Sequence, residues 1–340
     1  MPEITFDQAK NFLESITSED KVAIIHHDDG DGFCSGILYY DWCKQKNAET
    51  EQFTYKIRRS SLKDFNLDKF NKIIVCDLAP DFMAEELELI RDKKVLYTDH
   101  HPREIPVPKE ILELVTTDQG YIPSSRTAGE LTGLKPWLSL IGTVTDAGDL
   151  YPENQDFINE RLKQIKMTLE EFKQNITSVV TNFLVYFEKD LNKAFEILQK
   201  ISSIEEIKNL KQYSEPVEDE VQKFVDGYES KKEKLGDVNY YYFEPHFSVK
   251  LPVSGIISQK NNDDAYIFAS PKNNGENISF SARNTSQKIN MADLLRTGVE
   301  GLEDGNAGGH APAAGGMILA KDIDKFKENI RNYLAGPKKS

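Results

Sequence analysis

The segment that most constrains this chain is IIHHDDGDGFCSG, residues 24–36, in which two imidazoles and three carboxylates follow an apolar run. His27, Asp29 and Asp31 alternate along it, so an extended backbone would turn these three side chains to one side. Unpaired carboxylates this close together repel one another. A divalent cation would remove the repulsion, and mixed imidazole and carboxylate ligands favour manganese, iron or zinc over calcium. The alternative is a solvated acidic turn, because Asp and Gly commonly form turns.

Three later segments also end in side chains that can bind metals. Two are apolar runs that predict buried strands, and the third predicts a buried helix. Because strands of an open parallel sheet place ligands at their C-terminal ends, we expect these side chains to meet at one edge. They are Asp77 after IIVC, Asp99, His100 and His101 after KVLYT, and Asp146 after the helix predicted over 136–144.

The order of the predicted elements indicates an α/β protein with two main domains and a helical spacer. In residues 1–150 strand and helix patterns alternate, which predicts a mostly parallel sheet flanked by helices. Residues 151–237 have few glycines and a 3.6-residue apolar period, so they predict a helical extension and spacer. Residues 238–340 predict a smaller mixed α/β domain. The N-terminal strands are expected at 21–25, 51–57, 73–76 and 95–98, with helices at 33–46, 81–91, 123–134 and 136–144.

Together these motifs resemble the DHH family of phosphoesterases, which includes the RecJ nucleases and the phosphodiesterases of small oligonucleotides and cyclic dinucleotides. Several spaced motifs in one order are far more specific than one short motif. The family's H-x-D-x-D-G matches residues 27–32, its strand-ending Asp matches Asp77, its DHH triplet matches residues 99–101, its fourth motif matches Asp146, and GNAGGHAPAAGG at 305–316 resembles the glycine-rich His motif of the DHH-associated domain.

The resemblance implies two metal ions, typically manganese, although the ligand types also permit magnesium, iron or zinc. Six donors exceed what one tetrahedral ion uses, which agrees with a pair of ions. Asp99 is then expected to orient His100 or a neighbouring backbone group. By the family's motifs His27, Asp29 and Asp77 would hold one ion, and Asp31, Asp77, His100 and Asp146 would hold the other, with Asp77 shared.

Further residues are expected to contact the substrate. His101 would hydrogen-bond the phosphate or the attacking water, making it catalytic together with Asp99 and Asp77; the alternative is a packing role. Arg126, with the N–H groups of a helix begun by Ser124 or Ser125, could form an anion-binding corner, or could be a solvated arginine. A helix N-terminus is also expected at 311–314. In the C-terminal domain, the predicted substrate-binding residues are Arg283, Asn284, Gly308, Gly309 and His310.

Composition limits the substrate and the compartment. A net charge of −14 disfavours a broad interface with long nucleic acid, because such binding depends on Lys and Arg. Three cysteines without a C-x-x-C spacing indicate neither disulfides nor a zinc knuckle, and are expected to be reduced and buried. The sequence lacks a membrane span and a signal-peptide pattern, so the cytoplasm is expected. A homodimer is compatible with the sequence.

These observations predict a manganese-dependent phosphodiesterase that cuts short single-stranded oligonucleotides or dinucleotides to mononucleotides in a cleft between two lobes. The nearest alternative is a processive single-strand exonuclease of the RecJ type. A hydrolase of cyclic dinucleotides or of phosphoadenosine phosphate comes next. A non-catalytic DHH scaffold is a further alternative, and the presence of all six proposed ligands argues against it.

Overall fold

The computed structural model describes residues 5–116 and 120–336. The chain forms two compact units, Met1–Ser214 and Glu215–Ser340, and the boundary falls inside helix α10, Lys211–Lys231. The predicted spacer, 151–237, is therefore divided between the two units. Among the described residues, no helix is both long enough and apolar enough to cross a lipid bilayer.

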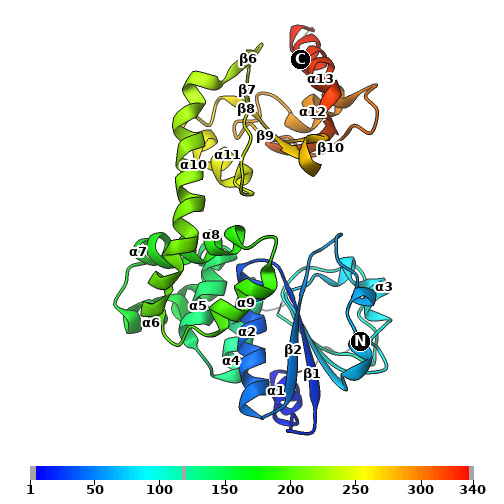
Figure 1. The fold of residues 1–340 in the computed structure, drawn as a ribbon, viewed down its shortest axis with the longest axis vertical. Coiled ribbons are helices and arrows are strands. Elements are labelled where there is room, and N and C mark those ends of the chain that lie inside the picture. Colours follow the sequence, from blue (N-terminus) through cyan, green and yellow to red (C-terminus); the bar gives the residue numbers. More distant parts are fainter. Residues whose placement is uncertain (1–4, 117–119, 337–340) are drawn as a thin grey trace. The chain divides into compact units, whose positions relative to one another are not determined.

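A five-stranded parallel sheet with the order β2-β1-β3-β4-β5 forms the centre of the N-terminal unit (Figure 1). This confirms the predicted α/β class. The fifth strand was not predicted, because its four residues are too few to show a periodic pattern. The strands are β1 (Lys21–His27), β2 (Glu49–Tyr55), β3 (Lys72–Cys76), β4 (Lys94–Asp99) and β5 (Leu112–Val115).

Both faces of this sheet are covered, which explains why its strands read as continuous apolar runs. Ile74 and its neighbours on one face join the core formed with helices α2 (Gly30–Gln45) and α5 (Pro136–Thr145). Val75, one residue along, faces a second core on the other side. The side chains at the ends of the strands are therefore the ones left free to form a site.

The remaining helices of the N-terminal unit complete the first core. Phe172, Phe183 and Phe195, from the region predicted to be a spacer, are buried in the same cluster as α2 and α5. The predicted helix at 81–91 is shorter, because the chain forms a 3-10 turn at Pro80–Phe82 and must turn again before β4. The other helices are α1 (Phe6–Glu14), α3 (Ala84–Leu87), α4 (Ser124–Thr132), α6 (Gln155–Ile165), α7 (Leu169–Phe172), α8 (Ser178–Tyr186) and α9 (Leu191–Gln199).

The C-terminal unit is a mixed sheet with the order β10-β11-β9-β8-β7-β6 (Figure 1). Phe280 of the sheet stacks on Phe326 of α13, with ring centroids 4.2 Å apart, and this pair lies in the unit's core. The elements are β6 (Glu233–Leu235), β7 (Val238–Tyr242), α11 (Lys250–Gln259), β8 (Ala265–Lys272), β9 (Asn277–Arg283), α12 (Met291–Val299), β10 (Asn306–His310), β11 (Ala313–Leu319) and α13 (Ile323–Ala335).

The glycine-rich segment is a β-hairpin, so the helix N-terminus predicted at 311–314 is wrong. His310 pairs with Ala313, and the chain turns through the two residues between them. The prediction failed because strands built from Gly and Ala have neither β-branched side chains nor alternating polarity to reveal them.

Candidate metal centre

The segment that carries His27, Asp29 and Asp31 lies where β1 ends and α2 begins. The strand ends at His27, and Asp29 caps the helix by accepting a hydrogen bond from the Gly32 N–H at 3.0 Å. A Cβ atom on Gly32 would lie 2.5 Å from the His27 carbonyl oxygen, which explains why glycine occupies this position. The extended alternation predicted for this segment therefore stops before Asp31, which lies in the first turn of α2.

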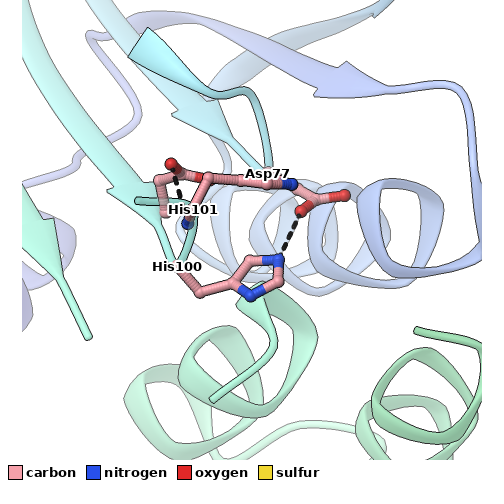
Figure 2. Close-up of side chains that lie close together, drawn as sticks. Asp77, His100 and His101 are labelled. Carbon is pink, nitrogen blue, oxygen red and sulfur yellow. Dashed lines mark hydrogen bonds and ion pairs between the residues drawn. The ribbon is translucent and has the colours of Figure 1, made fainter. Parts of the chain in front are cut away.

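Asp77 lies at the centre of the cluster, directly after β3. Its φ of 58° is left-handed, a conformation that Asp adopts more readily than most residues. Its carboxylate is buried, and Figure 2 shows it beside His100, whose Nε2 lies 3.3 Å from one oxygen. The other oxygen lies 3.8 Å from Nδ1 of His27. Asp77 therefore lies between two imidazoles that come from different strands.

The ligand atoms form two groups around Asp77. In the first, Nδ1 of His27 lies 2.8 Å from Asp29. In the second, Nε2 of His100 lies 3.4 Å from the Asp146 carboxylate, which follows α5. Within each group the candidate ligand atoms are within 4.8 Å of one another, and the groups are His27, Asp29 and Asp77, and Asp31, His100 and Asp146. A third group of possible ligands, Asp77, Asp99, His100 and His101, shares Asp77 with the first group and His100 with the second.

The electrostatics of this cluster fit bound cations. Burial raises the pKa of Asp31 well above its usual value, and the nearby Asp77 and Asp146 raise it further. Burial lowers the pKa of His27, but contacts with Asp29 and Asp77 outweigh it and raise this pKa to about 11. Burial also lowers the pKa of His100, but Asp77 and Asp31 outweigh it and raise this pKa to about 9. Asp77 Oδ2 and Nδ1 of His100 are buried without a hydrogen-bond partner among the described residues, and Nε2 of His100 makes ion-pair contacts with Asp77 and Asp146 but no hydrogen bond. Buried nitrogen and oxygen atoms left short of hydrogen bonds are the ligand types that a metal ion takes.

Asp99 holds His101. Its carboxylate accepts hydrogen bonds from the backbone N–H of His101 at 3.2 Å and from the ring Nδ1 at 2.8 Å. The expectation that Asp99 orients a neighbouring backbone group agrees with this contact, whereas the His100 ring contacts Asp77 and Asp146. The side chain of His101 is 37% exposed, and its ring centroid lies 4.4 Å from that of His100. The Asp99 contact thus fixes a half-exposed imidazole beside the cluster.

The predicted anion-binding corner at the start of α4 is taken by the protein's own carboxylate. The backbone N–H groups of Ser124 and Ser125 donate to Asp31 at 2.7 and 3.0 Å. Arg126 is occupied as well: it donates to Glu130 at 2.9 Å and to the carbonyl of Glu153 at 2.8 Å. These contacts make Arg126 a structural clamp and leave its predicted role in substrate binding without support.

The predicted substrate-binding residues of the C-terminal unit fall into two sets. Arg283 on β9 pairs with Ala313 on β11, which in turn pairs with His310 on β10, and Gly308 lies two residues before His310 on the same strand. Among the residues that the structure describes, no carboxylate pairs with Arg283. Gly309, with a φ of 135°, packs so closely on β11 that a Cβ atom would lie 2.6 Å from the Ala313 carbonyl oxygen.

Asn284, unlike Arg283 and His310, uses its side chain to hold the unit's own loops. It is 1% exposed, its amide nitrogen donates to the carbonyls of Asp263 and Asp264, and its oxygen accepts from the Ile289 N–H. Its polar atoms hold two loops together. The predicted contact with substrate has no free donor or acceptor to use.

Tyr121 was missed by the sequence analysis. Its hydroxyl donates to Oδ2 of Asp146 at 2.7 Å, and its ring meets the His100 ring edge-on with centroids 4.9 Å apart. A single tyrosine in a loop gives no motif or period that could have revealed it. The contact makes Tyr121 a residue that positions Asp146.

Family models match both units of the chain. The DHH family, N-terminal domain, matches residues 21–136, and the DHHA1 domain matches residues 248–336. The chain therefore belongs to the DHH family of phosphoesterases and carries a C-terminal DHHA1 domain. No curated protein matches the chain.

Solved structures share the fold. Exonuclease RecJ bound to manganese is 17% identical, with a TM-score of 0.71 over 99% of this chain and 96% of the other. RecJ from Thermus thermophilus in complex with Mn²⁺ is 16% identical, with a TM-score of 0.67 over 99% of this chain and 56% of the other. The DHH domain of a member of a family of ribosomal proteins is 14% identical, with a TM-score of 0.64 over 97% of this chain and 90% of the other.

Proposed function

We propose that this protein is a manganese-dependent phosphodiesterase that hydrolyses short single-stranded oligonucleotides or dinucleotides to mononucleotides. One observation carries the proposal: six imidazole and carboxylate side chains from four segments, with Asp77 in the middle, converge in one place and leave buried ligand atoms without hydrogen bonds. When bound, two divalent cations would lower the pKa of a water molecule and neutralise phosphate oxygens. The two groups around Asp77 would hold the ions, and Asp77 would be shared.

Residues of both units would contact the substrate. His101, held by Asp99, would donate a hydrogen bond to a phosphate oxygen, because burial lowers its pKa but Asp99 outweighs this and raises it to about 9. In the C-terminal unit, Arg283 would bind a substrate phosphate with its planar fork of donors. His310 and the exposed Gly308 on the hairpin would contact the same substrate.

The processive RecJ-like exonuclease is the second candidate, and the fold shared with RecJ favours it. The net charge of −14 favours short substrates instead. Hydrolysis rates measured on strands from dinucleotides to long single strands, in manganese and in magnesium, separate the two. We expect rates that fall with length, whereas rates that rise with length would support the exonuclease. Cyclic dinucleotides and pyrophosphate are tested as further substrates. If the protein hydrolyses none of these substrates, the proposed function is rejected.

Tyr121→Phe should weaken manganese binding by about tenfold, because removing a partner that orients a ligand typically costs about 10- to 100-fold in affinity. The substitution keeps the ring and removes only the hydroxyl bonded to Asp146. Titration calorimetry with Mn²⁺ measures the change. Tyr242→Phe is the matched control, since that hydroxyl bonds Glu244 at 2.9 Å in the other unit. Equal affinities for wild type and Tyr121→Phe would show that the hydroxyl does not position Asp146.

Arg283→Ala should raise the KM for a dinucleotide by about tenfold or more and change kcat less, because lost substrate binding appears mainly in KM. Steady-state kinetics at saturating manganese measure both constants. Arg296→Ala is the control: this arginine lies on α12 and contacts Asp293 at 3.2 Å. An effect of Arg283→Ala confined to kcat would contradict the recognition role.

A further inference from the structure

Two tyrosines form a stack that begins at the candidate metal centre. The rings of Tyr121 and Tyr151 are nearly parallel, at 12°, with centroids 4.1 Å apart. Tyr121 also contacts the centre itself through its hydroxyl on Asp146 and its ring edge on His100. Tyr151 therefore lies one ring farther from these two residues than Tyr121 does.

The loop that carries Tyr151 is fixed to the segment that carries Tyr121. Asn154 is fully buried, and its amide nitrogen donates to the carbonyl of Tyr121 at 2.7 Å and to that of Gly148 at 2.9 Å. The backbone N–H of Tyr121 donates to the carboxylate of Glu153. These bonds hold the stack in place from both sides of Tyr151, so the position of the ring is set before any ligand binds.

Tyr151 nevertheless remains open to solvent. It is 39% exposed although one face rests on Tyr121, and the adjacent Leu150 is 73% exposed. Exposure of a tyrosine or leucine is ordinary by itself, so the informative feature is that this exposed ring is held in a fixed position by the buried Asn154 and by the Tyr121 ring. An anchored aromatic surface beside the candidate metal centre matches the stacking platforms that hold nucleobases.

We propose that Tyr151, supported by Tyr121, is a stacking platform for the nucleobase of the nucleotide whose phosphate lies at the metal centre. The inference rests on the proposed function and adds a subsite to it. Stacking uses the π face that every base has, so the platform selects nucleotides without selecting among bases. Substrates that carry phosphate without a base, such as pyrophosphate or sugar phosphates, would lack this contact.

Equilibrium binding tests the platform independently of catalysis. Adenosine monophosphate and ribose 5-phosphate differ by the base alone, and calorimetry in manganese measures both. Wild type should bind adenosine monophosphate more tightly by roughly tenfold to a hundredfold, the range of base–aromatic stacking. Tyr151→Ala should remove most of this preference, and Tyr151→Trp should keep it because a larger ring replaces the smaller one. Equal preference in wild type and Tyr151→Ala would overturn the proposal.

Kinetics on a dinucleotide and on the same molecule with one abasic position give the second readout. Tyr151→Ala should raise the KM for the intact dinucleotide far more than for the abasic one. Tyr186→Ala is the matched control, because Tyr186 is also 39% exposed and contacts Phe187 and Tyr213 on the helices. If wild type hydrolyses neither substrate, the proposed function fails, while the binding experiment still decides the platform. Equal rises in KM for both substrates would contradict stacking.

Discussion

Asp77→Asn is expected to lower kcat/KM for a dinucleotide by at least about a thousandfold, which corresponds to roughly 4 kcal/mol of transition-state stabilisation. The Asp77 carboxylate contacts His27 in one ligand group and His100 in the other, so under the proposed function its loss would remove a ligand from each ion. Asn is the appropriate replacement, because it tolerates the left-handed φ of 58° whereas Ala would add about 1–2 kcal/mol of strain. Steady-state kinetics with manganese measure the effect.

The control for this variant is a neighbouring carboxylate outside the two groups. Asp28 lies 3.3 Å from Nε2 of His27 and is about one-third exposed, and Asp28→Asn should reduce kcat/KM far less. Circular dichroism spectra of both variants should match that of wild type. Turnover by Asp77→Asn close to that of wild type would reject the assignment of the site.

Lys72→Met is expected to destabilise the N-terminal unit by about 3–5 kcal/mol, the usual cost of leaving one partner of a buried ion pair uncompensated. Lys72 is 4% exposed at the start of β3, and its ammonium group donates to the Ser15 carbonyl at 2.6 Å and to Asp20 at 3.0 Å. Asp20 also accepts from the Thr17 N–H and from Asn71, so the pair joins the segment after α1 to β3. Without Lys72, the Asp20 carboxylate would remain buried and unpaired.

Urea unfolding followed by tryptophan fluorescence measures this effect in the relevant unit, because Trp42 and Trp137 both lie within it. Lys21→Met is the matched control: the Lys21–Glu49 pair also spans 3.0 Å, but both side chains are about half exposed. A surface pair of this kind contributes about 0–1 kcal/mol. Equal losses from the two substitutions would contradict a special role for the buried pair.

The Lys72–Asp20 pair also makes the stability of the folded protein depend on pH. Burial raises the pKa of Asp20, but hydrogen bonds from the Thr17 backbone and from Lys72 outweigh it and lower the pKa to about 2. A carboxyl with a lowered folded-state pKa stabilises the protein above its unfolded pKa of about 4, and this stability is lost as the pH falls toward 2. In Lys72→Met this acid-dependent loss should be smaller, because the hydrogen bond that lowers the pKa is missing.

The convergence of the metal-binding side chains could be predicted because strand ends carry a strong signal. The apolar run before Asp77 and the run before His100 end at one edge of a parallel sheet, as their pattern indicated. The prediction that Asp77 is shared between two ions rests on the resemblance to the family, because spacing alone cannot say which of several carboxylates lies in the middle.

The failures of prediction have physical causes as well. The N–H groups of Ser124 and Ser125 do face an anion, but that anion is Asp31, and no local pattern connects residues 93 and 94 positions apart. The strands of the β10–β11 hairpin consist mostly of Gly and Ala and show no alternation of polar and apolar side chains, so their sequence resembled that of a loop. Tyr121 acquires its role from contacts with residues distant in the sequence, chiefly the hydrogen bond to Asp146 and the edge-on contact with His100. Such tertiary contacts appear only once the fold is known.

Anomalous diffraction from crystals grown with manganese would locate any cations held by the side chains around Asp77. We expect two anomalous peaks, one beside His27, Asp29 and Asp77 and one beside Asp31, Asp77, His100 and Asp146. In Asp77→Asn crystals grown in the same way, at least one peak should weaken or disappear. An absence of anomalous density among these residues in the wild-type protein, or manganese bound elsewhere, would show that these side chains do not form a two-metal site.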